Sequence, residues 1–274
     1  MKKIFHLKKY IKNFLKKGKS PYRDYPFGRQ PKASKQSYID LWEAAKIIDY
    51  PIINNFEKEL GFTIEKTWLD NLALHTQVVI KKSKISYQHG RILYSALCNY
   101  IKHNNYLDIN IIEIGTARGF SSLCMAKSLN FFKIEGKIIT IDPLPHKVKM
   151  FWNCIDDWDG EKTREQLLSN YKVLTKKYIN FIEGESENEL PKIKLSRIHF
   201  AFIDGTHEYE NIIMEFNFVA SKQLAGDIII LDDYTPNLFP GVVKSVDYVC
   251  KQYNYSKRVI DLSNERGYVI AIKN

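Results

Sequence analysis

The pattern of hydrophobic and polar positions changes near residue 106 of this 274-residue chain. Before that point, residues 37–48 and 87–102 repeat apolar positions every three or four residues, as on one face of a helix. After it, short apolar runs alternate with helical stretches, such as 115–129 and about 161–178. We expect the runs to be β-strands. They span residues 109–114, 137–141, 178–183, 198–203, 227–231, 257–262 and 268–273.

The strand runs are mostly apolar throughout, which is typical of parallel strands buried on both faces. The last two runs are separated only by a short turn containing Asn264 and Gly267, so we expect them to form an antiparallel hairpin. The sequence therefore predicts an α/β fold with a seven-stranded, mostly parallel, doubly wound sheet and an N-terminal helical cap. In such sheets, ligands bind beyond the carboxyl ends of the strands.

We divide the chain into a basic arm and linker (1–35), a helical cap (36–105) and the sheet domain (106–274). The arm holds ten Lys and two Arg against one acid, Asp24. Its apolar residues have helical spacing, which favours docking of residues 1–20 on an anionic membrane surface or on a partner. A solvated tail and a helix packed on the protein's own body are the alternatives. The apolar positions are Ile4, Leu7, Ile11, Phe14 and Leu15.

Beyond the arm, the charges nearly balance, so the basic pI does not indicate a nucleic-acid-binding face. No apolar run reaches the 18–20 residues or so of a membrane helix, and we expect no secretory signal. The cysteines lack metal-ligand spacing and are expected to be reduced thiols. We therefore expect a cytoplasmic protein, which the arm could hold at the inner face of the membrane. The cysteines are Cys98, Cys124, Cys154 and Cys250.

A glycine-containing turn, Glu113-x-Gly115-x-x-x-Gly119, joins the first strand run to the following helix. Glycines permit a tight turn, and a helix N-terminus favours an anionic group, although a purely structural turn would look the same. The pattern resembles motif I of the class I S-adenosylmethionine-dependent methyltransferases. The resemblance implies that S-adenosyl-L-methionine is bound by Glu113, Gly115, Thr116, Gly119 and Ser121.

Two later segments extend this resemblance. Asp142 closes the second strand run 27 residues after Gly115, where the family binds the ribose hydroxyls with a carboxylate. A carboxylate can accept both hydrogen bonds of a vicinal diol, whereas the structural alternative is an acid that caps the Pro143 turn. After the third run, Glu185 and Ser186 resemble the segment that borders adenine.

Three carboxylates follow the fourth and fifth strand runs, namely Asp204, Asp232 and Asp233. Adjacent strands lie about 5 Å apart, so these acids should converge and repel one another unless a cation binds them. Oxygen ligands suit Mg²⁺ or Mn²⁺. The alternative is pairing with Lys or Arg, but no Lys or Arg lies within three positions of Asp204 or of the Asp232–Asp233 pair.

The acids resemble the metal site of the O-methyltransferases of the macrocin and mycinamicin sugar type and of the catechol type. In these families, a base stands three residues after the first acid, a position that His207 occupies here. The resemblance covers about residues 70–274. It implies a Rossmann-like methyltransferase fold and a metal-assisted transfer of a methyl group to a hydroxyl, with His207 as general base. A structural surface histidine is the alternative.

We expect the acceptor to be a small molecule or glycan with a sugar or polyol hydroxyl. Weaker site candidates are His75, His89, Trp152, Trp158 and Tyr234. A nucleic-acid methyltransferase that uses the basic arm is a second hypothesis. A non-catalytic peripheral membrane protein and an NAD-dependent oxidoreductase are others. A homo-oligomer is compatible with the sequence.

Overall fold

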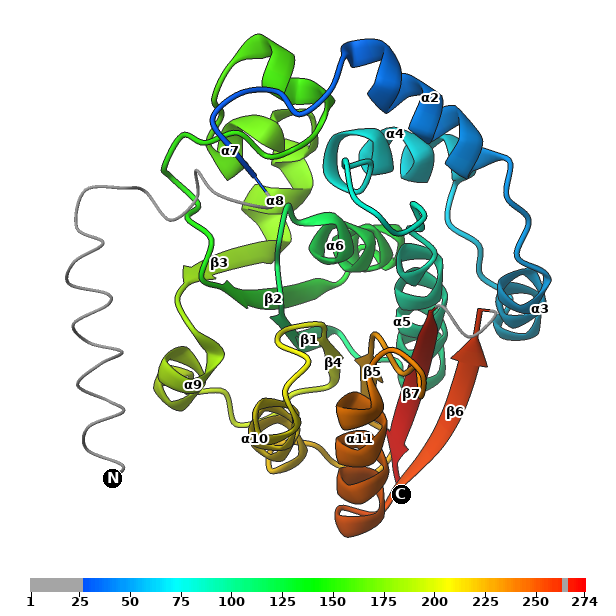
Figure 1. Cartoon of the computed structure of the whole chain (residues 1–274). Coiled ribbons are helices and arrows are strands. Elements are labelled where there is room, and N and C mark those ends of the chain that lie inside the picture. The colour runs from blue at the N-terminus through cyan, green and yellow to red at the C-terminus, as the bar shows by residue number, and fades with distance from the viewer. Residues whose placement is uncertain (1–26, 263–265) are drawn as a thin grey trace, which may run out of the picture.

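A computed structural model describes residues 27–262 and 266–274 and places one mixed sheet at the centre (Figure 1). The strand order across the sheet is β3-β2-β1-β4-β5-β7-β6. The strands are β1 (Asp108–Ile114), β2 (Glu135–Asp142), β3 (Ile179–Glu183), β4 (Phe200–Ile203), β5 (Ile228–Leu231), β6 (Tyr255–Asp261) and β7 (Gly267–Lys273).

The first five strands are parallel, and β7 runs antiparallel between β5 and β6. In register, Ile114 of β1 pairs with Ile141 of β2 and with Ile203 of β4, which aligns the carboxyl ends of these strands. Leu231 of β5 pairs with Ile203. The predicted fold class, including the closing antiparallel hairpin, is confirmed.

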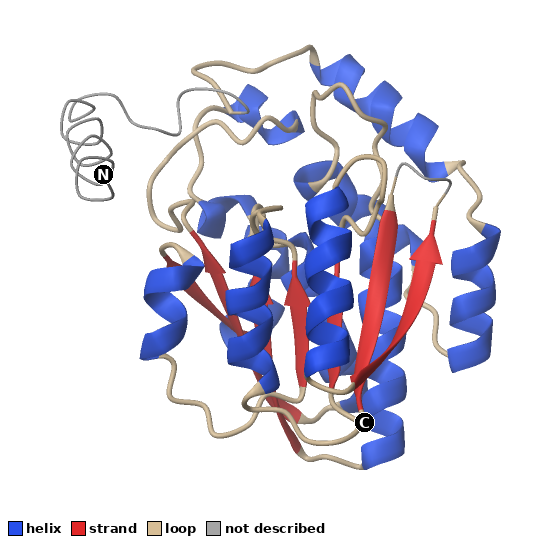
Figure 2. Cartoon of the chain, turned by 60° about the horizontal axis from the view of Figure 1, so that its bottom comes forward, coloured by secondary structure: helices blue, strands red, loops and turns tan. Residues whose placement is uncertain are grey.

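Helices cover both faces of the sheet, as Figure 2 shows. Successive side chains of a strand point to opposite faces, so Ile109 and Ile111 of β1 join one core cluster while Ile112 and Ile114 join the other. The first cluster includes residues of α5 (His89–Asn104), α6 (Phe120–Phe132) and α8 (Lys172–Tyr178). The second includes residues of α10 (Tyr209–Ala220) and α11 (Pro240–Gln252).

The N-terminal helices pack against this body (Figure 1). They are α2 (Lys35–Lys46), α3 (Pro51–Leu60) and α4 (Lys66–Thr76). The Ser34 hydroxyl accepts a hydrogen bond from the amide of Ser37 and so caps α2. Helix α4 packs on α6, α2 packs on α4, and α3 contacts both α5 and β6. No described helix is both long and apolar enough to cross a membrane. The basic arm predicted for residues 1–20 lies outside the described residues.

The helical stretch predicted for about 161–178 is not one helix. It consists of α7 (Arg164–Leu167), a 3₁₀ turn (Ser169–Tyr171) and α8. At the break, the side chain of Leu168 is buried close to Gly119. The described chain also contains shorter elements. These are a 3₁₀ turn at Ile155–Asp159, the helix α9 (Ser186–Glu189) and a second 3₁₀ turn at Leu190–Lys192, which directly follows α9.

Candidate active site

Two cavities lie along the edge of the sheet where the parallel strands end. The turn cavity, of about 280 Å³, lies beside the β1–α6 turn and is lined by Gly115, Asp142, Glu185, Ser186 and Asp204, among others. The hairpin cavity, of about 440 Å³, borders Arg266 at the start of the β7 strand and is lined by Asp233. The carboxylates of Asp204 and Asp233 therefore stand close together but face different cavities.

The β1–α6 turn brings the main chain against the end of β4. Gly115 has φ +94°, and a Cβ there would lie 1.9 Å from the carbonyl oxygen of Asp204, so only glycine fits. Ala117 also has a positive φ, of 44°, which is unusual for a residue with a side chain. Its amide donates a 2.7 Å hydrogen bond to Oδ2 of Asp142. The turn is thus held in one conformation by a carboxylate at the end of β2.

Three of the predicted cofactor residues lie beneath this turn. Glu113 is fully buried and accepts hydrogen bonds from the hydroxyls of Ser121 and Ser122, and burial raises its pKa. The hydroxyl of Thr116 is hydrogen-bonded to that of Thr140. None of these side chains lines the turn cavity. They therefore stabilise the conformation of the β1–α6 turn and do not line the cavity. Gly119, at the N-cap of α6, is the last residue of this turn.

Asp142 caps the Pro143 turn, as the structural alternative predicts, and its side chain also lines the turn cavity. Its Oδ1 accepts a 2.7 Å hydrogen bond from the amide of Leu144, across the Pro143 turn. Burial raises the pKa of Asp142, and Arg164, with Nη2 at 3.7 Å, opposes that shift. The carboxylate oxygens can each accept further hydrogen bonds, so a diol could still bind.

Arg164 and Glu215 are site residues that the sequence patterns do not single out. Arg164 is almost fully buried and donates to the carbonyl of Ala117 at 2.9 Å, which ties α7 to the turn. Glu215 lines the turn cavity from α10 and is only 1% exposed. In the sequence, Glu215 could have been identified as a single acidic residue on the otherwise apolar face of a helix.

Glu215 has one satisfied and one unsatisfied oxygen. The hydroxyl of Ser186 donates a 2.6 Å hydrogen bond to its Oε1, whereas Oε2 has no partner within the described structure. Burial raises the pKa of Glu215 to about 7. A buried acceptor without a partner is costly, so this oxygen marks a point where a ligand could donate a hydrogen bond.

Asp204, His207 and Asp233 form a compact group whose possible ligand atoms all lie within 4.8 Å of one another. Nε2 of His207 lies 2.5 Å from Oδ2 of Asp233, and this hydrogen bond raises the pKa of the imidazole. Burial raises the pKa of Asp204 well above its usual value, and the nearby Asp232 and Asp233 add to that shift. The ring of Phe239 stacks on His207 with centroids 4.4 Å apart.

Asp232 differs from the expectation that all three acids form the cation site. Its Oδ2 accepts a 2.8 Å ion-pair hydrogen bond from Arg266, and its Oδ1 accepts a bond from the amide of Asp233. Burial alone would raise the pKa of Asp232, but Arg266 lowers it. This partner could not be predicted from residues close to Asp232 in the sequence, because Arg266 lies 34 residues away. The structure thus groups His207, in place of Asp232, with the other two acids.

The main chain at Asp233 has φ +57°, a strained conformation for a residue with a side chain. It is fixed on both sides, because the amide of Asp232 donates to the carbonyl of Ile203 at 3.2 Å and that of Tyr234 donates to Gly267 at 2.9 Å. Such strain, held by the surrounding sheet, is common where a side chain must be aimed at a site. It aims Asp233 toward His207.

The weaker candidates do not line either cavity. His75 is paired with Asp156 at 2.5 Å, and the buried indole of Trp152 donates to the carbonyl of Lys162. The indole of Trp158 donates to Ala33, and the phenol of Tyr234 donates to Asp247. His89 is buried against Phe120, and burial lowers its pKa to about 3. None of the five lines the turn or hairpin cavity.

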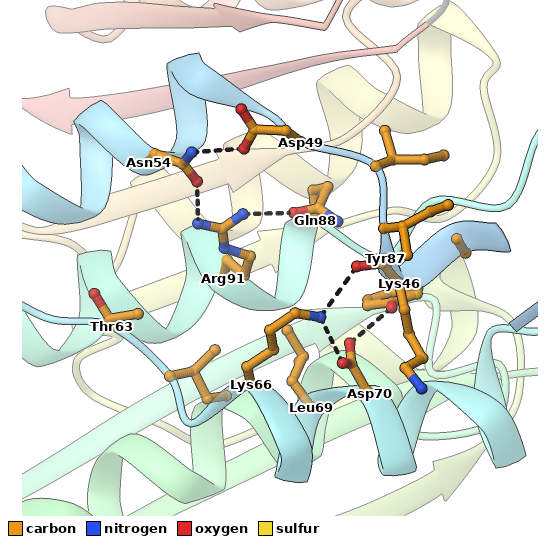
Figure 3. Close-up of a pocket in the computed structure, with 14 residues that line it drawn as sticks. Lys46, Asp49, Asn54, Thr63, Lys66, Leu69, Asp70, Tyr87, Gln88 and Arg91 are labelled. Carbon is orange, nitrogen blue, oxygen red and sulfur yellow. Dashed lines mark hydrogen bonds and ion pairs between the residues drawn. The ribbon is translucent and has the colours of Figure 1, made fainter. Parts of the chain in front are cut away.

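A further cavity of about 330 Å³ lies among the N-terminal helices and α5, and we call it the cap cavity (Figure 3). Its polar side chains satisfy one another: Arg91 donates to Asn54 and Gln88, and Lys66 binds Asp70 at 2.6 Å. It contains none of the residues that the sequence predicts for catalysis. We therefore place the chemistry at the turn and hairpin cavities.

Comparison with known proteins agrees with this fold. A family model described as a methyltransferase domain matches residues 112–234. A similar solved structure is an O-methyltransferase from Bacillus cereus in complex with SAH, 14% identical, with a TM-score of 0.52 over 88% of this chain and 100% of that one. Another is the O-methyltransferase TomG from Streptomyces achromogenes, 15% identical, with a TM-score of 0.55 over 78% of this chain and 92% of that one. No curated protein matches the sequence.

Proposed function

We propose that this chain, a methyltransferase of the S-adenosylmethionine-dependent class I type, transfers the methyl group to a hydroxyl oxygen of a sugar or polyol-like acceptor. The observation that carries the proposal is the group of Asp204, His207 and Asp233, which stands between the two cavities. In this arrangement, the turn cavity binds the methyl donor and the hairpin cavity binds the acceptor. The solved structures of similar fold named above are O-methyltransferases.

The turn cavity has the donors and acceptors that S-adenosylmethionine needs. The glycine turn at Gly115 and Gly119 admits the amino-acid end close to the main chain, with Glu113, Thr116 and Ser121 supporting it. Asp142 accepts hydrogen bonds from the ribose hydroxyls. Glu185 and Ser186 border the adenine, and the free Oε2 of Glu215 accepts a hydrogen bond from its exocyclic amino group. The similar structures named above contain SAH or SAM.

The chemistry of the residues fits a divalent cation. Two carboxylates and an imidazole nitrogen converge. Burial, together with the neighbouring acids, raises the pKa of Asp204, and a bound cation would oppose this shift. We assign the cation to Asp204 and Asp233, while Asp232 stays paired with Arg266 and steadies the Asp233 main chain. When bound, Mg²⁺ or Mn²⁺ would lower the pKa of the acceptor hydroxyl.

His207 receives the proton of the acceptor hydroxyl. Asp233 orients its ring through Nε2, and Phe239 holds the plane of the ring from one side. The deprotonated oxygen then attacks the sulfonium methyl group in line with the departing sulfur. The protein's part is thus to place the hydroxyl at the boundary of the two cavities and to remove its proton.

Transfer of a ¹³C-labelled methyl group from S-adenosylmethionine to a panel of sugars and sugar nucleotides, followed by NMR of the products, tests this proposal. We expect a methyl ether as the product. We expect His207→Ala to lower the rate by about 10²–10⁴-fold, because general-base assistance is lost. His103→Ala, which removes an exposed histidine at the end of α5, is the matched control. A methyl group found on nitrogen or carbon, or a wild-type rate in His207→Ala, would contradict the proposal.

A further inference from the structure

The hairpin cavity carries an excess of positive charge. Its cationic lining residues are Lys81 and Lys84, from the loop between α4 and α5, and Arg266. Arg266 is committed to Asp232, and Asp233, the acid that lines this cavity, is already hydrogen-bonded to His207. Neither Lys81 nor Lys84 forms an ion pair within the described part of the chain. Lys81 is close enough to Asp232 and Asp233 for their charges to act on it, but these acids are already hydrogen-bonded to Arg266 and His207, so Lys84 in particular has no charged partner there.

Polar atoms in the same cavity are also unpartnered. The hydroxyl of Ser86 and Nε of Arg266 are both buried, and neither has a hydrogen-bond partner among the described residues. Native proteins satisfy nearly all buried polar groups, so such atoms indicate a position that a ligand or an ordered water fills. Both atoms can donate a hydrogen bond, which an acceptor atom would receive.

A cation bound by Asp204 and Asp233 would increase this excess of positive charge, since it adds two charges beside the cavity. A neutral sugar would leave the lysines uncompensated, whereas an anion would balance them through charge-assisted hydrogen bonds. The volume, about 440 Å³, is within the ordinary range for small-molecule sites and accommodates a monosaccharide with a charged substituent.

We propose that the acceptor is an anionic sugar derivative, whose phosphate or carboxylate group is bound in the hairpin cavity by Lys81, Lys84, Ser86 and Arg266. This inference rests on the proposed function, because it assigns the hairpin cavity to the acceptor. The charged group anchors the sugar between the α4–α5 loop and Arg266, and a hydroxyl of the same sugar reaches Asp233 and His207. A phosphoryl group and a carboxylate use the same contacts, so the test has an arm for each.

Calorimetric titration of the full chain, saturated with SAH and Mg²⁺, tests the anion site without any transfer step. The probes are inorganic phosphate, glucose 1-phosphate, glucuronate and the neutral methyl glucoside. We expect the wild type to bind phosphate or at least one charged sugar and to bind methyl glucoside more weakly. Stronger binding of glucose 1-phosphate or of glucuronate tells which anion the site prefers.

The variant K81Q/K84Q should weaken binding of the charged probes at least tenfold, and should leave the affinity for methyl glucoside unchanged. Lys82→Gln, a neighbouring exposed lysine that does not line the cavity, is the matched control and should bind like the wild type. Retained SAH binding shows that the variant is folded.

Two results would overturn the inference: equal affinity of the wild type for charged and neutral probes, or unchanged binding of the charged probes in K81Q/K84Q. Failure of the proposed function would look different. In that case, charged probes would bind with the expected lysine dependence, yet no sugar would accept a methyl group from S-adenosylmethionine.

Discussion

Glu215 is a buried residue whose ionisation makes the stability of the fold depend on pH. Burial raises its pKa from 4.5 in the unfolded chain to about 7. The protonated carboxyl group therefore contributes stability that is complete below about pH 4.5 and is lost as the pH rises through 7. Between pH 5 and pH 8, this loss amounts to about 2–3 kcal/mol.

The variant Glu215→Gln cannot ionise and should lack this loss. Urea unfolding at pH 5 and pH 8 should show it gaining about 2–3 kcal/mol relative to the wild type as the pH rises. Glu210→Gln, an exposed acid on the same helix, should keep the wild-type pH dependence. Parallel pH profiles for Glu215→Gln and the wild type would refute the raised pKa.

The sequence predicted the residues whose structural role is set by their immediate neighbours in the chain. Gly115 is needed because the chain turns at the end of a strand, and Asp142 lies where a strand meets a proline. The partners of Asp142 and Asp232, namely Arg164 and Arg266, come from distant segments. No local pattern identifies such partners, since they are brought close only by the fold.

Among the elements, the β1–α6 turn has the strictest requirement. In Gly115→Ala, the added Cβ would collide with the carbonyl oxygen of Asp204 at 1.9 Å, so the ends of β1 and β4 must separate. We expect a loss of more than about 2 kcal/mol in unfolding free energy, together with loss of SAH binding.

Gly226→Ala is the matched control for this variant. Gly226 also has a positive φ, of +88°, but a Cβ there meets no atom within 4 Å. It should therefore cost only about 1 kcal/mol, the price of the backbone conformation, as measured by urea unfolding. Equal losses in the two variants would show that the approach of Gly115 to Asp204 carries no special constraint.

Strand boundaries were predicted to within two residues for all seven strands, because each strand has an apolar centre flanked by polar or turn-forming residues. The segment of residues 161–178 was predicted less well, because its break at Leu168 is set by packing against Gly119. Helical periodicity reports which face is buried but not whether the chain turns in the middle. Arg164, in the short helix before this break, donates a hydrogen bond to the main chain of the β1–α6 turn.

Across the whole molecule, the alternation of strands and helices fixed the sheet and therefore the edge at which the site lies. For the helical cap, the sequence predicted helices and two weaker site candidates, His75 and His89, but not the loop that lines the hairpin cavity. That loop, between α4 and α5, supplies Lys81, Lys84 and Ser86 to the hairpin cavity. This contact forms only in the folded protein, between segments that are distant in the sequence. No periodic pattern in the sequence predicts it.

The proposed function depends on a cation between donor and acceptor, and the rate of labelled methyl transfer with and without chelator tests this most directly. We predict that chelation abolishes transfer, that Mg²⁺ or Mn²⁺ restores it, and that Asp204→Asn resembles the chelated enzyme while still binding SAH. Asp40→Asn, at an exposed position on α2, should behave like the wild type. Full activity in chelator, or in Asp204→Asn, would contradict the assignment of a metal to this site.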